Sequence, residues 1–447
     1  MYKLEILVFM LNVGVLVWVM TGGSCMRRKI VVVVAISVVN LIQVIVDTRW
    51  QMMFVYLIPI FSILYMFALK YNRHSRKKWK KVLGVSLIII YVFFSFALPC
   101  FLPMYTFPQP TGNHAVGTKI LYLQGNRHEL MIQVWYPTEA IINQERSPYM
   151  VDGPEVTASL SHMLGFPSFT LRHLEVIATH AYMDAPLSPR QSSYPVLLFS
   201  HGLGGVRNQN TFQLEELASH GYIVIGFDHP TYAAATVFPD GEVMKNQYPN
   251  LPRAGYEELD THMRTWASNS KFVLDHLEAL NQSAPFHNTM DLGRIGMLGH
   301  SYGGATAVYM LLHDDRIKVA MNMDGGIFGL DNMPQKLHKP LLLMAADTSL
   351  DQEIFYETLA SFTDEEVFEQ TGQTKAWHKE NMKEVFARRE RMLKAGANSI
   401  ILPNTNHISF SDLPMYAPVL LAPNGDPAEV HTAVNQVTLR FFDDHLK

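Results

Sequence analysis

Residues 295–304 of this 447-residue chain read IGMLGHSYGG. An apolar stretch ends here in Ser301, which has a glycine two positions before it and another two positions after it. The order of apolar strand, Gly-x-Ser-x-Gly turn and helix is typical of a nucleophile elbow, in which a strained serine projects its hydroxyl above the edge of a sheet. We therefore predict that Ser301 is a nucleophile. The alternative is a plain strand-to-helix turn that needs glycine only for space.

Short apolar stretches alternate with helix-forming stretches on both sides of this turn. Residues 119–123 and 130–136 flank GNRHE and predict a β-hairpin. Further strands are predicted over residues 196–200, 222–228, 294–299, 319–324, 341–347 and 399–402, and helices over 211–219, 256–280 and 305–312. Continuously apolar strands that alternate with helices predict a mostly parallel sheet covered by helices on both faces. The charged segment at about 350–397 is expected to be an inserted helical hairpin, either a lid or a solvated surface excursion.

A serine hydroxyl needs a base that accepts its proton and a third group that orients the base. In this architecture the order along the chain is nucleophile, acid, base. His407 lies in the polar loop PNTNHISF directly after a predicted strand, so we predict that it is the base. Two aspartates end neighbouring predicted strands, Asp324 in VAMNMD and Asp347 in LLLMAAD. The sequence logic alone leaves both as candidate acids.

A glycine-rich loop, FSHGLGG at residues 199–205, follows an earlier predicted strand. Backbone N–H groups of such a loop stabilise a developing oxyanion, together with the N–H of the residue after the nucleophile. We predict that the amides of Leu203 and Tyr302 form this oxyanion hole. His229, in DHPTY, is expected to be structural.

The first part of the chain differs in composition from the rest. Four apolar runs, at residues 4–20, 30–46, 52–69 and 82–102, each have about the length of a membrane-spanning helix. Through residue 81 there are 12 Lys+Arg against two acidic residues, a net charge of +10, which leaves −14 for the remainder. Basic residues gather after the first and third runs, so the positive-inside rule predicts that both these loops are cytoplasmic. The N-terminus and everything after the fourth run would then lie outside, in a multi-pass protein of the cell membrane.

The domain organisation follows from these features. We expect a transmembrane region at 1–105, an extended linker at 106–117 and a folded domain at 118–447. The two cysteines, Cys25 and Cys100, fall at opposite membrane faces in this topology, so no disulfide between them is expected. The chain has no GxGxxG, Walker, HExxH or Cys/His motif, so no nucleotide cofactor, other cofactor or metal is expected. The basic stretch at 70–81 is interpreted as a topology signal or an anionic-lipid contact rather than a nucleic-acid site.

The motifs together carry a family resemblance. FSHGLGG, GHSYGG, MNMDGG and NHISFSDL, in that order, resemble the secreted and intracellular type II platelet-activating factor acetylhydrolases and their bacterial esterase relatives, within the α/β-hydrolases. The resemblance covers about residues 118–447 and implies an α/β-hydrolase fold and metal-independent catalysis. It also implies nucleophile Ser301, acid Asp324, base His407 and oxyanion donors at Leu203 and Tyr302. It thus favours Asp324 over Asp347.

The function predicted on these grounds is a membrane-anchored serine hydrolase that cleaves carboxylic esters, short-acyl or lipid-like, through an acyl-enzyme. Its partners would be a small-molecule or lipid ester and the membrane lipid around the helices. A non-catalytic membrane receptor or transporter-associated domain on the same fold is the alternative from another class. An acyltransferase or peptidase on the same scaffold is a third interpretation.

Overall fold

A computed structural model describes residues 3–21, 25–46, 49–71, 78–126, 128–139, 144–350, 352–422 and 425–447. The chain divides into two compact units: a helical unit of Met1–Tyr105 with Tyr416–Leu420, and an α/β unit of Thr106–Met415 with Leu421–Lys447. Each is described by itself. Several residues used in the charge and hairpin arguments lie outside the described residues: Asp47, Arg73, Arg76, Lys77 and Arg127.

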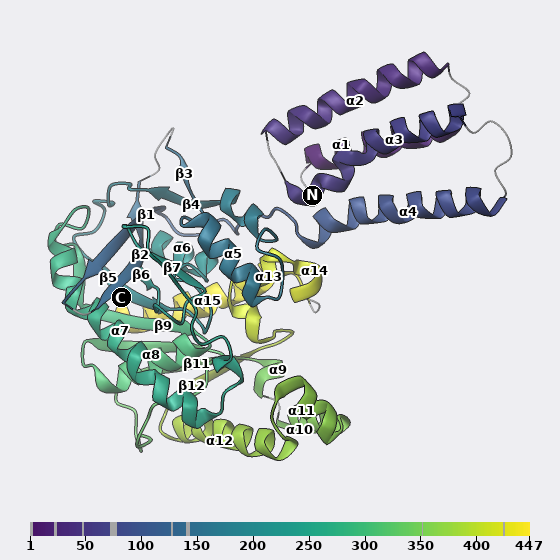
Figure 1. The fold of residues 1–447 in the computed structure, drawn as a ribbon. Coiled ribbons are helices and arrows are strands. Elements are labelled where there is room, and N and C mark those ends of the chain that lie inside the picture. The colour runs from purple at the N-terminus through teal and green to yellow at the C-terminus, as the bar shows by residue number, and fades with distance from the viewer. Residues whose placement is uncertain are drawn as a thin grey trace. The chain divides into compact units, whose positions relative to one another are not determined.

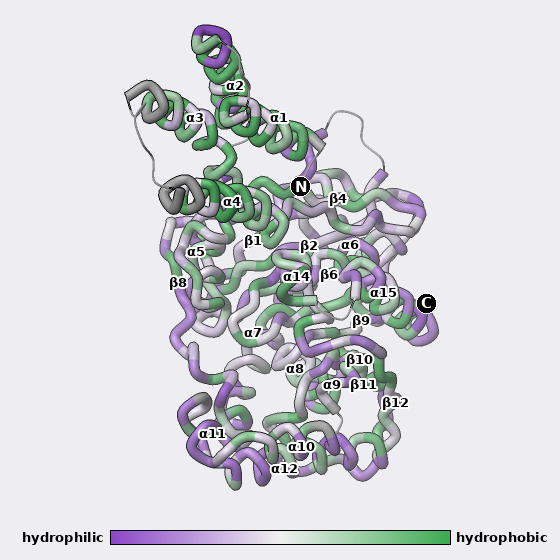
Figure 2. The backbone as a smooth tube through the Cα atoms, turned by 90° about the vertical axis from the view of Figure 1, so that its right-hand side faces the viewer, coloured by the Kyte–Doolittle hydropathy of each residue, from purple (hydrophilic) through white to green (hydrophobic). Residues whose placement is uncertain are grey.

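The helical unit contains four long apolar helices, as the sequence predicts (Figure 1). They are α1 (Lys3–Thr21), α2 (Met26–Val46), α3 (Met53–Tyr71, preceded by the short η1, Trp50–Met52) and α4 (Lys78–Phe101). Each is long and apolar enough to cross a membrane by length and composition. Figure 2 shows their hydrophobic residues in green.

A few polar side chains are buried inside the helical unit. Asn12 on α1 and Asn40 on α2 exchange hydrogen bonds of 2.9 and 3.0 Å through their side-chain amides. Glu5 and Arg49 form a buried ion pair. These pairs satisfy polar groups that would otherwise be costly in an apolar environment, so they fix how the helices pack.

A ten-stranded sheet forms the centre of the α/β unit in the described residues, in the order β12-β11-β10-β9-β5-β6-β2-β1-β4-β3. The six strands from β12 to β6 run parallel to one another, whereas β2 pairs antiparallel with both β6 and β1. The prediction of a mostly parallel sheet flanked by helices is confirmed. The strands are β1 (Ala115–Gln124), β2 (Glu129–Thr138), β3 (Arg146–Pro148), β4 (Ala178–Met183), β5 (Tyr194–Ser200), β6 (Ile223–Phe227), β9 (Met290–His300), β10 (Ile317–Met323), β11 (Leu341–Ala346) and β12 (Asn398–Leu402), with a separate pair β7 (Ala235–Val237) and β8 (Val243–Lys245).

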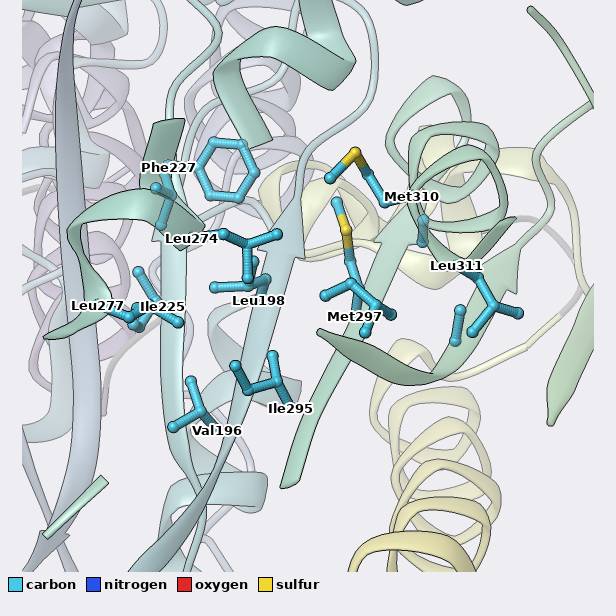
Figure 3. Packing of buried hydrophobic residues seen from close by; sticks show 14 of the residues in the cluster. Val196, Leu198, Ile225, Phe227, Leu274, Leu277, Ile295, Met297, Met310 and Leu311 are labelled. Carbon is cyan, nitrogen blue, oxygen red and sulfur yellow. The ribbon is translucent and has the colours of Figure 1, made fainter. Parts of the chain in front are cut away.

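Helices cover both faces of this sheet. On one face, Leu274 and Leu277 of α7 and Met310 and Leu311 of α8 pack on alternate residues of β5, β6 and β9 (Figure 3). On the other face lie α6 and α15, and a side chain at Gly296 of β9 would come within 3.1 Å of Phe442 on α15. The helices of the unit are α5 (Gly153–Met163), η2 (Arg172–Val176), α6 (Thr211–Ser219), η3 (Leu251–Arg253), α7 (Tyr256–Gln282), α8 (Tyr302–His313), α9 (Asp347–Leu350), α10 (Gln352–Ser361), α11 (Asp364–Thr371), α12 (Lys375–Lys394), η4 (His407–Phe410), α13 (Leu413–Tyr416) and α15 (Pro427–Leu446). Helix α14 (Pro418–Leu421) belongs largely to the helical unit.

The segment 106–117 differs from the extended linker that its composition suggests. Phe107 is buried against Tyr149, and the backbone N–H of Thr111 donates to the Glu216 carboxylate at 2.8 Å. Strand β1 already begins at Ala115. Apolar and hydrogen-bonding groups in a Pro-rich stretch thus attach it to the domain, which the uncharged composition alone did not indicate.

The inserted segment contains three helices, α10, α11 and α12, where the sequence predicted a hairpin of two. Arg388 of α12 makes two hydrogen bonds to the Asp260 carboxylate of α7, at 2.7 and 2.9 Å, and a third to the carbonyl of Ile327 at 3.1 Å. This partly buried ion pair is shielded from solvent and holds α12 on the α/β unit. Helix α12 is thus attached to α7 through Arg388.

Burial lowers the pKa of four of the buried histidines in the α/β unit below the usual 6.5, to about 3 for His300 and about 4 for His431. The other two are His201 and His229. Below pH 6.5 the unfolded chain therefore binds more protons at these sites than the folded chain does. Their contribution to stability is present above that pH and is lost as the pH falls. Burial raises the pKa of two carboxyls, Glu215 to about 8 and Asp412 well above its usual value. These two groups bind protons in the folded state and so oppose the loss of stability at low pH, but they are fewer than the four histidines.

We expect the free energy of unfolding to fall between pH 6.5 and 4, by roughly 1–3 kcal/mol per pH unit for an excess of one to two protons. Denaturant titration of the full-length chain in detergent, followed by tryptophan fluorescence, measures this. A free energy that stays constant over the range would contradict the assignment of these histidines as neutral.

Candidate active site

Ser301 lies between β9 and α8 in a strained backbone conformation, with φ 57° and ψ −124°. A Cβ at Gly299 would lie 2.3 Å from the carbonyl carbon of Gly303, and a Cβ at Gly303 would lie 2.0 Å from the carbonyl oxygen of Ser200. Real side chains do not tolerate such distances. The two glycines therefore allow a turn tight enough to present the Ser301 hydroxyl.

His407, Asp324 and Ser301 are joined by two hydrogen bonds. The Nδ1 of His407 lies 2.7 Å from Oδ2 of Asp324, and its Nε2 lies 3.0 Å from Oγ of Ser301. Because an ionised carboxylate only accepts, Nδ1 carries the proton and Nε2 is free to accept the serine proton. This is the relative arrangement of nucleophile, base and orienting acid.

Asp324 directly follows β10 and has a positive φ of 54°. Its side chain is almost fully buried, and it also accepts hydrogen bonds from the Ala346 amide (2.9 Å) and the Ser349 hydroxyl (2.7 Å). Burial alone would raise the pKa of Asp324, but the hydrogen bond and charge of His407, with the bonds from Ser349 and Ala346, lower it below its usual value. The carboxylate is therefore ionised and oriented at neutral pH.

Asp347, the other candidate acid, has different partners. It begins α9, and its carboxylate accepts hydrogen bonds from the backbone N–H groups of Asn404 (2.7 Å) and Thr405 (3.2 Å). These residues belong to the loop that carries His407. Asp324 therefore forms a hydrogen bond with the His407 ring, whereas Asp347 accepts hydrogen bonds from the backbone of the loop that carries His407.

The loop 202–205 lies beside the nucleophile: a Cβ at Gly202 would be 3.1 Å from Cβ of Ser301. Three of its four amides donate hydrogen bonds within the protein, Gly202 to Gln209, Gly204 to the carbonyl of Tyr232 and Gly205 to the carbonyl of Gly202. The Leu203 amide has no such acceptor among the described residues. An amide without an acceptor beside the nucleophile is what an oxyanion donor requires. The Tyr302 amide, at the first position of α8, is the second candidate donor.

Aromatic side chains gather on the Leu203 and Tyr302 side of the nucleophile. Tyr302 packs edge-on against Trp266 and stacks on Phe328, in one apolar cluster that also includes Tyr232. His229 stacks on Trp266 at 3.7 Å, and its Nε2 lies 2.9 Å from the Ser200 hydroxyl, as expected for a structural histidine. The residue after the nucleophile is therefore anchored in an apolar cluster against which Leu203 also packs.

Two residues at the site did not emerge from the sequence argument. Ser349 of α9 donates to the candidate acid Asp324, and Gln209 contacts both the loop 202–205 and His300. Serine and glutamine have no motif of their own at these places. Their only sequence signal is position, shortly after a predicted strand end and shortly after the glycine-rich loop.

A parallel sheet with a serine at a strand-to-helix turn and a histidine on a loop at the carboxyl edge defines the α/β-hydrolase class. Comparison with known proteins agrees. The family model for the α/β-hydrolase fold matches residues 195–407, and the model for platelet-activating factor acetylhydrolase, isoform II, matches residues 100–281.

Individual relatives are ester-cleaving proteins by name. A platelet-activating factor acetylhydrolase of Cavia porcellus is 25% identical over 267 residues, which cover 54% of this chain and 61% of that protein. A probable 1-alkyl-2-acetylglycerophosphocholine esterase of Arthroderma benhamiae is 32% identical over 135 residues, which cover 30% of this chain and 32% of that protein. The structure of a ferulic acid esterase from Streptomyces cinnamoneus covers 77% of this chain and 94% of its own, with a TM-score of 0.57 and 25% identity.

The chain therefore has an α/β-hydrolase fold and is similar, over part of its length, to the platelet-activating factor acetylhydrolases. It spans about 60% of the length of the first of these curated relatives.

Proposed function

We propose that the chain is a membrane-anchored serine esterase in which Ser301 attacks a carboxylic ester, His407 is the base and Asp324 orients it. The observation that carries the proposal is the pair of hydrogen bonds through the His407 imidazole, to Asp324 on one side and to Ser301 on the other. The serine proton has a defined acceptor, and the resulting imidazolium has a buried carboxylate beside it.

The reaction runs in two halves. The Ser301 oxygen bonds to the ester carbonyl carbon while its proton moves to Nε2 of His407, and the amides of Leu203 and Tyr302 stabilise the oxyanion. The C–O bond then breaks, and the leaving alcohol takes the proton from His407. Water repeats these steps on the acyl-enzyme: it gives a proton to His407 and releases the carboxylic acid, and Ser301 regains its proton.

The substrate class that we propose is a short-acyl or lipid-like ester. The apolar cluster of Tyr302, Trp266, Phe328 and Tyr232 supports an apolar group beside the nucleophile. Relatives named for acetyl glycerophosphocholine esters and for platelet-activating factor support a short acyl chain on a lipid alcohol. No cofactor takes part in this proposal.

A substrate panel tests this function. We expect full-length protein in detergent to hydrolyse short-acyl p-nitrophenyl esters and a short-acyl phosphatidylcholine. The kcat/KM for matched long-acyl esters should be at least about tenfold lower, because differences of several methylenes change transition-state binding by a few kcal/mol. If no ester is hydrolysed, the esterase proposal is wrong, and a preference for long acyl chains would overturn the substrate class alone.

The membrane part of the proposal rests on α1 to α4. Fewer than two fifths of the residues in each apolar window are buried by protein, and large side chains such as Val31 (67%), Ile45 (75%) and Phe93 (62%) are exposed. So much exposed apolar surface favours a lipid environment. With the basic residues after the first and third helices inside, the α/β unit lies outside the cell membrane.

Protease treatment of intact cells tests this topology. We expect a protease added from outside to degrade the α/β unit, residues 106–447, and to leave a fragment of about the size of the helical region in the membrane. Full protection in intact cells, with digestion only after lysis, would place the α/β unit in the cytoplasm instead.

A further inference from the structure

A continuous chain of hydrogen bonds connects the oxyanion loop to the backbone of the proposed base, through two side chains with no part in the proposed chemistry. Nε2 of Gln209 lies 2.7 Å from Nδ1 of His300, and Nε2 of His300 lies 2.7 Å from the carbonyl oxygen of His407. A carbonyl oxygen only accepts, so Nε2 of His300 carries the proton, and its Nδ1 accepts from the Gln209 amide. The donor and the acceptor of each of these hydrogen bonds are thereby assigned.

The other end of Gln209 holds the oxyanion loop. Its Oε1 accepts the N–H of Gly202 at 3.1 Å, in the residue directly before Leu203. A Cβ at Gly205 would come within 1.9 Å of this same oxygen, so the glycine leaves room for the Gln209 side chain. Gln209 therefore bonds to the loop next to its oxyanion donor and to the residue next to the nucleophile.

His300 is uncharged and connects Gln209 to the His407 backbone in this series of hydrogen bonds. It is only 5% exposed, and its ring lies 4.8 Å from the ring of His407. Burial, and then the charge of His407, lower the pKa of His300 to about 3. His300 thus stays neutral when His407 takes up the serine proton, and no second cation opposes that step.

Further contacts tie the same two segments together. The side-chain amide of Asn210 donates to the carbonyl of Phe410 at 2.6 Å, and the Asp412 carboxylate accepts the N–H of Thr211 at 2.8 Å. The segments 202–212 and 407–412 are thereby joined at several points, with His300 and Gln209 at the point nearest Ser301.

We propose that His300 and Gln209 are positioning residues that hold the His407 backbone and the Leu203 amide at a fixed spacing on either side of Ser301. This role rests on the proposed esterase function of the site. Because both partners act through one chain of bonds, removing either should release both the base and the oxyanion loop.

The test compares His300→Phe, Gln209→Leu and the double variant in full-length protein. We expect each single variant to lower kcat by about 10- to 100-fold with KM changed less than about threefold, since small misplacements of catalytic groups cost rate rather than ground-state binding. The double variant should be no slower than the slower single variant, because both substitutions break one network. His300→Gln, which keeps an N–H donor at a similar reach, should recover part of the loss, and the distant His276→Phe on α7 should leave kcat unchanged.

Hydrogen exchange is a second measurement that needs no turnover. In His300→Phe, amides of 202–212 and of 407–412 should both exchange faster than in the wild type, while the strands of the sheet keep their protection. This decides the positioning role even if the chain hydrolyses no ester. A folded His300→Phe variant with wild-type kcat, additive effects in the double variant, or faster exchange in only one of the two segments would overturn it.

Discussion

Ser301→Ala is expected to lower kcat for a short-acyl ester by about 10⁴- to 10⁶-fold, which is the range expected when a nucleophile with an assigned base is removed. The fold should be unaffected, because alanine fits the strained turn about as well as serine and the hydroxyl makes its only described side-chain contact with His407. The measurement is steady-state hydrolysis by purified full-length protein.

Ser361→Ala is a matched control. Ser361 ends α10, and its hydroxyl donates to the nearby carbonyl of Thr358, at an exposed position. It should keep full activity. A folded Ser301→Ala variant that keeps more than about a hundredth of wild-type activity would show that another group performs the attack.

Asp324→Asn is expected to lower the acylation rate by about 10³- to 10⁴-fold, whereas Asp347→Asn should lower it by less than about tenfold. An asparagine at 324 turns an amide NH₂ or a neutral oxygen toward Nδ1 of His407, so it no longer fixes the tautomer or stabilises the imidazolium. The Asn404 and Thr405 amides donate to different oxygens of Asp347, so an asparagine at 347 keeps one of these two bonds and leaves the bond between Asp324 and His407 intact. Rapid-mixing measurement of the first turnover separates acylation from deacylation.

The relative size of the two losses is the decisive result. A larger loss for Asp347→Asn than for Asp324→Asn would show that the acid belongs to the later strand. Equal large losses would mean that the backbone contacts of Asp347 matter as much as the orientation of the imidazole.

The sequence predicted the central strands and helices well because each is a continuous apolar or amphipathic stretch with clear ends. Helix 211–219 begins and ends at the predicted residues, and the strand before Ser301 ends one residue later than expected. Segments without such periodicity were not predicted: β3, β4 and α5, and the packing of 106–117 through Phe107. Their positions depend on contacts with residues far away in the chain.

At the candidate site, too, local sequence patterns predict some residues, whereas others depend on contacts between distant segments. Motif and order along the chain predict Ser301, His407 and the glycine-rich loop as candidates, and the structure brings these three together. Motif and order do not separate Asp324 from Asp347, because both end neighbouring parallel strands and so reach the same edge of the sheet. Only the direction of each carboxylate distinguishes them. The roles of Gln209 and His300 likewise depend on distances between segments that are about 100 and 200 residues apart.

Covalent labelling tests the central claim most directly. Membranes that contain the full-length chain are treated with a fluorophosphonate, which phosphonylates a serine activated by a base with loss of fluoride, and the modified residue is located by peptide mass spectrometry. We predict one adduct per chain, on Ser301, and none in the Ser301→Ala variant. An adduct on another residue, equal labelling of both proteins, or no labelling of either would contradict the assignment of Ser301 as the nucleophile of an esterase.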